Sequence, residues 1–276
     1  MKYFKLTLVS TLILTFSLAT YAATKHEMGI IINLSGKQRM LTQKITKEIL
    51  LIANGIDVKA NLANVKKSAA LFDKTLKGLL NGDKELGLVK TESVLIIQQL
   101  HVVNRLWQLF YYNVNKVLEN RDTSKAVLQK IARLNMPLLR HMNKAVNMYE
   151  KRSGYTTLAP KMAEIINKAG RQRMLTQKMT KEFLLLAKRF AVKWHKVKLA
   201  KTVALFDETL NWLIRNTSER AILVQLNVVK NLWGEYKPIL DQVNVSREAL
   251  QKAARLNLPL LIQMNKAVEM YTASAK

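Results

Sequence analysis

The stretch NLSGKQRMLTQKITKE, residues 33–48, returns later in the chain as NKAGRQRMLTQKMTKE, residues 167–182. Twelve of the sixteen positions are identical, which is far beyond chance. Further echoes follow in the same order, such as Met-Asn-Lys-Ala-Val at 142–146 and again at 264–268. The sequence therefore predicts an internal duplication that spans most of the chain.

The number of residues that separates equivalent positions of the two copies falls twice along the chain. The two places where it falls indicate loops. They fall around residues 81–83 and 120–122, where Asn, Gly and Asp favour turns. Loops tolerate such losses better than helices or strands do. Between the breaks the apolar residues recur with helical spacing. The sequence predicts eight helices, near residues 25–54, 57–81, 92–119, 124–152, 160–192, 195–215, 218–241 and 246–273.

Local signals agree with several of these helix ends. Asn54-Gly55 suits a helix C-terminus, and Ser124 and Ser246 suit N-caps. Pro160 suits a first helical turn, where no backbone N–H is needed.

Four amphipathic helices joined by short loops form an antiparallel four-helix bundle. We therefore expect an all-α fold of two tandem antiparallel four-helix bundles after a signal peptide, with almost no strand. The expected bundles span residues 24–153 and 160–274.

Residues 1–22 have the pattern of a secretory signal peptide. A basic start, residues 1–5, precedes an apolar run over residues 6–19 and small residues up to Ala22. The apolar run is shorter than the roughly 20 residues that a membrane span needs. We expect cleavage after Ala22, export to the periplasm and no membrane span in the mature chain. A retained N-terminal anchor is the alternative.

Composition excludes several classes of function. The chain has no Cys, which excludes disulfides, thiol nucleophiles and cysteine zinc sites. Its four His residues have no metal-ligand spacing, and neither a nucleophile motif nor a phosphate-binding Gly loop is found. We expect no enzyme activity, no catalytic residue, no metal and no cofactor. The net charge of +26 favours anionic partners, and export argues against nucleic acid.

The first helix of each copy has a face that a core does not explain. Its apolar stripe consists of Ile31, Leu34, Leu41, Ile45, Ile49 and Ile52. Almost opposite lie Asn33, Gly36, Met40, Gln43 and Lys47, flanked by Arg39 and Lys44. The second copy repeats this face with Asn167, Gly170, Met174, Gln177 and Lys181, flanked by Arg173 and Lys178.

Glycine inside a helix costs roughly 1 kcal/mol relative to Ala, so a plain solvated face has no need of it. Glycine at such a position usually allows another backbone or a ligand to approach the helix closely. The forked donors of Arg match an oxyanion, and two Arg that meet would repel each other unless an anion lay between them. A solvated face, or a packing surface between the bundles without a ligand, remains the alternative.

The pattern Asn-x-x-Gly-x-x-Arg-Met-x-x-Gln-Lys resembles the periplasmic sensor domain of type IV pili methyl-accepting chemotaxis transducers, the PilJ-type domain. It is similar, more loosely, to the input domain of NarX-type nitrate/nitrite sensor kinases. The resemblance covers nearly the whole chain after residue 22, as two tandem copies, and implies a four-helix bundle. It implies that Arg39 and Arg173 contact the anion at a two-fold interface. The second basic position of the motif falls on Lys44 and Lys178, where the nitrate sensors have Arg.

We therefore expect the two copies to form a pseudo-dimer within the chain, in which the first helices pack on each other; a homodimer is the alternative. The expected ligand-binding residues are the repeated polar ones: Asn33, Gly36, Arg39, Gln43, Lys44, Asn167, Gly170, Arg173, Gln177 and Lys178.

Two functions remain open. The first is an exported sensor that binds a small anion such as nitrate or nitrite. Because the sequence stops at Lys276, this sensor is expected to act with a separate membrane receptor or sensor kinase. The second is a non-sensing envelope adaptor, related to type IV pili or chemotaxis, that docks through the repeated helix face. Binding to envelope polymers should weaken steeply with salt, whereas a pocket for one anion should respond to that anion's identity.

Overall fold

The computed structural model describes residues 23–153 and 158–275, which form eight α-helices. These are α1 (Lys25–Ala53), α2 (Val58–Asn81), α3 (Val94–Asn120), α4 (Lys125–Ser153), α5 (Pro160–Ala187), α6 (Val192–Arg215), α7 (Arg220–Asp241) and α8 (Arg247–Ala273). The described residues contain no β-strand, only an isolated bridge between Asp83 and Leu88. The all-α prediction is confirmed. The expected signal peptide, residues 1–22, lies outside the described residues.

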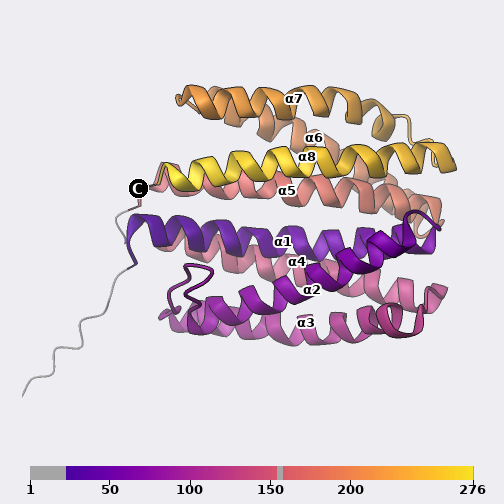
Figure 1. The fold of residues 1–276 in the computed structure, drawn as a ribbon, viewed down its shortest axis with the longest axis horizontal. Helices are drawn as coiled ribbons and strands as arrows, with labels where there is room; N and C mark the ends of the chain where they lie inside the picture. The colour runs from indigo at the N-terminus through magenta and orange to yellow at the C-terminus, as the bar shows by residue number, and fades with distance from the viewer. Residues whose placement is uncertain (1–22, 154–157, 276) are drawn as a thin grey trace, which may run out of the picture.

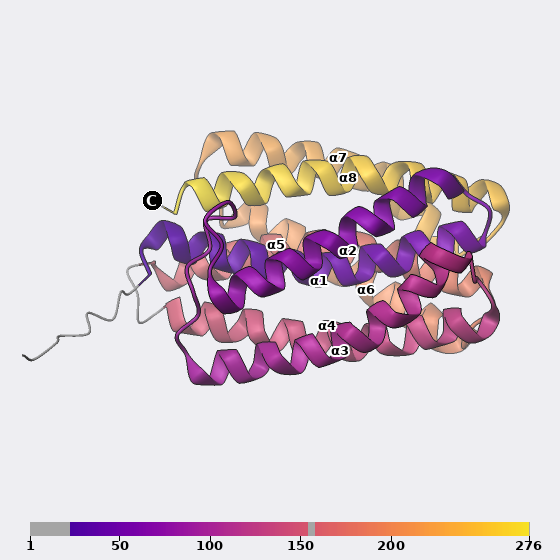
Figure 2. The same ribbon diagram turned by 60° about the horizontal axis from the view of Figure 1, so that its bottom comes forward.

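The eight helices form two four-helix bundles that lie against each other (Figure 1). Helices α1–α4 make one bundle and α5–α8 the other, as predicted. Helices α1 and α5 run side by side along the middle of the molecule, and they remain adjacent in the turned view of Figure 2. Contacts of α1 with α8 and of α4 with α5 flank this central pair. In the described part of the chain no helix is both long and apolar enough to cross a bilayer.

Each bundle has an aromatic pair buried in its core, stacked in the first bundle and tilted in the second. Phe72 of α2 lies 4.1 Å from Trp107 of α3 between ring centroids, and Phe206 of α6 lies 4.5 Å from Trp233 of α7. A glutamine of the repeated motif hydrogen-bonds to the phenylalanine of each pair. In the first bundle Gln38 donates to the carbonyl oxygen of Phe72 at 2.8 Å. Gln172, its counterpart, donates to Phe206 in the same way at 2.8 Å, and so both first helices are fixed to their own bundles.

The predicted end of the fifth helix is wrong by about one turn. We expected a helix to residue 192, but α5 ends at Ala187 and α6 begins at Val192. Arg189 takes a left-handed conformation, with φ of 54°, where the first copy has Gly55 at 68°. The turn is therefore the same in both copies, but the second copy lacks the glycine that signals it.

The second loss of residues shortens a helix and not, as predicted, a loop. Helix α3 has 27 residues and α7 has 22, while the connections after them, 121–124 and 242–246, are similar in length. The first loss does fall in a loop, since residues 82–93 of the first copy correspond to 216–219 of the second.

Because α1 and α5 form the largest contact between described helices, the two bundles should assemble without a covalent link. Residues 23–153 and residues 158–276, produced separately and mixed, should form a one-to-one complex in size-exclusion chromatography with light scattering. Gly170→Leu in the second half should prevent assembly, because Arg side chains of both halves lie beside this glycine. Gly234→Leu is the control, since a β-carbon there meets nothing within 4 Å. Halves that stay monomeric after mixing would contradict this expectation.

Candidate functional site

Helix α1 is buried on both of its faces. Its apolar face packs into its own bundle, and its polar face packs on α5. Arg39 is 0% exposed and Arg173, the equivalent residue of α5, is 1% exposed. The repeated polar face is therefore not a solvated surface, and its cations lie inside the molecule.

The two guanidinium groups meet beside the two glycines of the motif. A β-carbon added to Gly36 would lie 3.2 Å from Nη2 of Arg39 and 3.7 Å from Nη2 of Arg173. At Gly170 the corresponding distances are 3.6 Å and 3.4 Å. Both nitrogen atoms thus lie close to the same two points, one on each helix. The absence of side chains at these glycines lets arginines from both halves of the chain converge.

Arg39 links the two bundles through its hydrogen bonds. Its Nη1 donates to Oδ1 of Asn143 on α4, in its own bundle, at 2.9 Å. Its Nη2 donates to the main-chain oxygen of Asn167 on α5, in the other bundle, at 3.2 Å. Its third nitrogen, Nε, is buried without a hydrogen-bond partner.

Arg173 repeats this arrangement from the other side. Its Nη1 donates to Oδ1 of Asn265 on α8 at 2.9 Å, and its Nη2 donates to the main-chain oxygen of Asn33 on α1 at 3.0 Å. Its Nε is likewise buried and unpartnered. Asn33 and Asn167 thus contribute carbonyl groups of the backbone, while their side-chain oxygens are buried without partners.

The positive charge at this place is incompletely balanced. Among the described residues neither arginine forms an ion pair with a carboxylate. Burial, together with the charges of Arg171 and Arg173, lowers the pKa of Arg39 to about 9, while the charge of Glu150 opposes the shift. Burial also lowers the pKa of Arg173 to about 10, against the opposing charge of Glu269. A bound anion would offset this cost.

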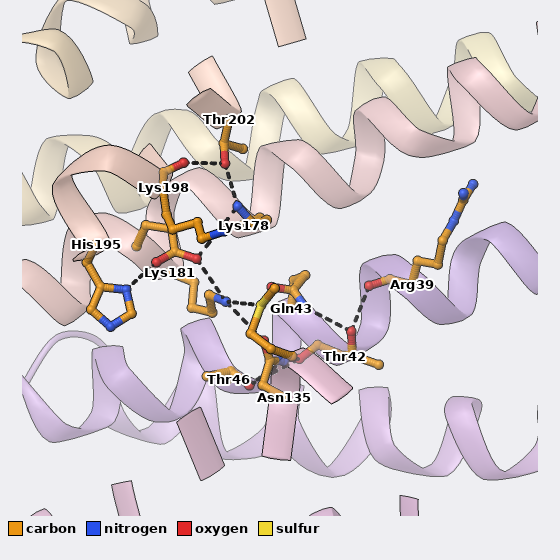
Figure 3. A network of polar contacts seen from close by, with 12 residues as sticks. Arg39, Thr42, Gln43, Thr46, Asn135, Lys178, Lys181, His195, Lys198 and Thr202 are labelled. Atoms are coloured by element: carbon orange, nitrogen blue, oxygen red, sulfur yellow. Dashed lines mark hydrogen bonds and ion pairs between the residues drawn. The ribbon is translucent and has the colours of Figure 1, made fainter. Parts of the chain in front are cut away.

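A second polar layer follows along the same interface and crosses it in both directions. Figure 3 shows one of these crossings, from Lys181 to Asn135. Nζ of Lys47 on α1 donates to Oδ1 of Asn257 on α8 at 2.9 Å. Nζ of Lys181 on α5 donates to Oδ1 of Asn135 on α4 at 3.0 Å. Each lysine is therefore held by an asparagine of the opposite bundle.

The expected glutamines belong to this second layer and not to the arginine pair. Nε2 of Gln43 donates to Oγ1 of Thr42 at 3.0 Å, and Nε2 of Gln177 donates to Oδ1 of Asn257 at 2.9 Å. The side-chain oxygens of both glutamines are buried without partners. In Figure 3 the side chain of Arg39 extends away from this layer.

Lys44 and Lys178 do not lie with the arginines, although the motif led us to expect them there. Nζ of Lys44 pairs with Glu48 and donates to Oγ of Ser68 on α2 at 3.0 Å. Lys178 points to Thr202 on α6 and to Glu182 in the same manner. Both lysines face their own bundle, because the polar partners of α2 and α6 lie on that side of the helix.

Sequence reasoning missed the asparagines that hold these cations. Asn143 and Asn265 recur within Met-Asn-Lys-Ala-Val, and Asn135 and Asn257 recur within Ala-Arg-Leu-Asn. Their recurrence in both copies was the available signal, since a polar residue kept through duplication and later buried needs a partner.

The sequence matches the family described as "Type IV pili methyl-accepting chemotaxis transducer N-term" (PilJ) over residues 23–133 and again over residues 156–266. The chain belongs to the PilJ family. It contains two PilJ domains in tandem, as the motif predicted, and the family is a sensor domain of chemotaxis transducers and not a class of enzymes.

One relative of these PilJ domains is the methyl-accepting chemotaxis protein McpN of Pseudomonas aeruginosa. It is 34% identical over 122 residues, which cover 41% of this chain and 22% of McpN. A solved structure described as the ligand-binding domain of the P. aeruginosa nitrate receptor McpN matches with 25% identity. That match covers 45% of this chain and 96% of the domain, with a TM-score of 0.39.

The buried lysines predict an unusual dependence of stability on pH. Burial lowers the pKa of Lys47 and of Lys178 from 10.5 to about 8. Between about pH 8 and 10 the unfolded chain therefore binds more protons, and the free energy of unfolding should rise with pH. Each group contributes up to about 1.4 kcal/mol per pH unit. Urea unfolding at several pH values in this window measures the slope.

Lys47→Met should flatten this slope, and Lys230→Met, at an exposed position of α7, should leave it unchanged. A wild-type stability that is constant or falls between pH 8 and 10 would contradict the lowered pKa values of these lysines in the folded protein.

Proposed function

We propose that the two PilJ domains form one sensor module that binds a small planar oxyanion, nitrate first among them, between Arg39 and Arg173. The observation that carries the proposal is the convergence of two buried guanidinium groups beside Gly36 and Gly170, each with an unpartnered Nε donor.

The unpartnered Nε donors of Arg39 and Arg173 favour an anion at this point of the interface. A buried N–H without an acceptor costs roughly 1–3 kcal/mol, and more when the group is charged. Nη1 and Nη2 of both arginines each have an acceptor, whereas Nε has none, so Nε is the nitrogen of each arginine that most lacks one. An oxyanion between the two guanidinium groups accepts from N–H groups of both and offsets the repulsion between the two cations, which amounts to a few kcal/mol at an effective dielectric constant of about 20.

Nitrate suits this arrangement by size, shape and charge. It is planar, as guanidinium is, and it carries a single negative charge between two positive ones. The glycines leave room only at the contact of the two helices, which favours a small ion over an organic acid. McpN, of which 122 residues are 34% identical to this chain, is described as a nitrate receptor.

A site shared by two domains can report binding as a change in their packing. An anion between the arginines draws α1 and α5 together. Each arginine also donates a hydrogen bond to the last helix of its own domain, α4 or α8. We propose that the module works in the periplasm and acts with a membrane receptor or sensor kinase, to which these helices pass the change.

The alternative of an adaptor that docks through the repeated face is not supported. That face is buried between α1 and α5, so it is closed to a partner in this structure. The face joins the two halves of the chain instead.

Nitrate should raise the melting temperature of the wild type in differential scanning fluorimetry, because it binds the folded state alone. The double variant Arg39→Ala/Arg173→Ala should lose this response. Arg133→Ala/Arg255→Ala is the control, since it removes the same charge from exposed repeated positions. If no oxyanion among nitrate, nitrite and perchlorate stabilises the wild type more than chloride does, the proposed ligand class is wrong.

Gly36→Ala should separate folding from binding. The added β-carbon gains helix stability of about 1 kcal/mol but lies 3.2 Å from Nη2 of Arg39, which must shift. We expect an unchanged or higher melting temperature without ligand and a nitrate affinity reduced about tenfold or more by isothermal titration calorimetry. Gly234→Ala gives the same gain at an open position and should bind nitrate normally. Equal affinities in the two variants would contradict the placement of the anion.

A further inference from the structure

A cleft of about 420 Å³ lies between α1, α2 and α8, and neither Arg39 nor Arg173 lines it. Its walls combine apolar side chains of all three helices with charged groups of α1 and α2. The size lies within the range of pockets that hold small organic ligands. This cleft is therefore a place distinct from the arginine pair.

The charge of the cleft favours an anionic ligand. Four lysines line it, with only Glu48 and Asp57 as acidic groups: Lys37, Lys44, Lys47 and Lys67. Lys47 is only 6% exposed, and Lys67 lies at the exposed rim. Carboxylates entering the cleft would thus meet ammonium groups both at its base and at its edge.

Glu48 also favours a ligand that carries a hydrogen-bond donor or a positive charge. Its Oε1 pairs with Lys44, but its Oε2 is buried without any hydrogen-bond partner. The side chain is only 1% exposed, and burial raises the pKa of its carboxyl group although Lys47 and Lys44 oppose the shift. A buried carboxylate oxygen of this kind is completed by an N–H or O–H donor.

The second bundle shows what completes the same carboxylate there. The equivalent residue, Glu182, pairs through Oε2 with His195 of α6 (Figure 3). Burial alone would raise the pKa of Glu182, but Lys181, His195 and Lys178 together lower it to about 2. The carboxylate of the second bundle thus has its donor within the protein.

The first bundle has Asn61 at the position of His195, and this side chain does not serve Glu48. Its Nδ2 donates to the main-chain oxygens of Ile56, at 2.9 Å, and of Asp57, at 3.2 Å. Both Glu48 and Asn61 line the cleft. The space that an imidazole fills in one bundle is therefore part of the cleft in the other.

We propose that this cleft is a second ligand site, which takes an acidic α-amino acid. The ammonium group of the ligand donates to Oε2 of Glu48, and its carboxylates accept from the lysines that line the cleft. The ligand's single net negative charge offsets part of the excess of four lysines over two carboxylates. The proposal does not depend on nitrate binding between the arginines.

Three dicarboxylates of equal chain length test it by isothermal titration calorimetry: L-aspartate, L-malate and succinate. They differ only in carrying an ammonium group, a hydroxyl group or neither, so affinity should fall in that order, with aspartate at least about tenfold above succinate. Equal binding of aspartate and succinate, or no aspartate binding at millimolar concentration, overturns the proposal.

Two variants of the cleft test the assignment of the donor and acceptor. Glu48→Gln should weaken aspartate binding about tenfold or more, whereas Glu235→Gln, exposed on α7, should not. Asn61→His should recreate the pair of the second bundle and so abolish aspartate binding in a folded protein. Asn104→His, the same change on α3, is its control. Aspartate binding that survives Asn61→His in a protein with a native circular dichroism spectrum would also overturn the proposal.

The two sites can be separated in the same experiments. The nitrate response should persist in Asn61→His, and aspartate binding should persist in Arg39→Ala/Arg173→Ala. Loss of both ligands in either variant would mean that one site, and not two, accounts for binding.

Discussion

The packing of two polar helix faces, those of α1 and α5, is the interaction on which the rest of the structure depends. It buries Arg39 and Arg173 together, each with hydrogen bonds to both bundles. Burying charge without a counter-charge is costly, and here neutral carbonyl and amide oxygens meet only part of that cost. The bundles are consequently joined by an interface that is well packed but electrostatically incomplete. An interface of this kind is suited to respond to an anion.

Duplication explains why the interface is nearly symmetric and why symmetry ends where it does. The arginine site uses residues of both copies at once, so a change in one copy alters the whole site. The carboxylates Glu48 and Glu182 each lie within one copy, where they can diverge independently. They have done so, since burial leaves the pKa of Glu48 raised, while Lys181, His195 and Lys178 lower that of Glu182. The arginine site, which both copies build, is therefore nearly symmetric, whereas the surroundings of the two carboxylates differ between the copies.

Coupling between the halves runs through side chains that cross the interface. Lys47 and Lys181 reach asparagines of the opposite bundle, as the arginines reach opposite carbonyl groups. These bonds lie along α1 and α5, the two central helices (Figure 1). A shift of one central helix against the other must therefore disturb several buried hydrogen bonds together, which favours discrete arrangements over gradual deformation.

The sequence by itself determined the duplication, the all-helical fold and most helix ends, because periodicity and capping residues are local properties. It also indicated Arg39 and Arg173, since glycine and arginine repeated together on a face opposite the core stripe favour a close helix contact. Only the tertiary structure decided that Lys44 and Lys178 turn toward their own bundles, and that Arg189 ends a helix without glycine. A helical wheel gives the direction of a side chain, but the groups that receive it come from helices distant in the sequence, and their placement depends on packing.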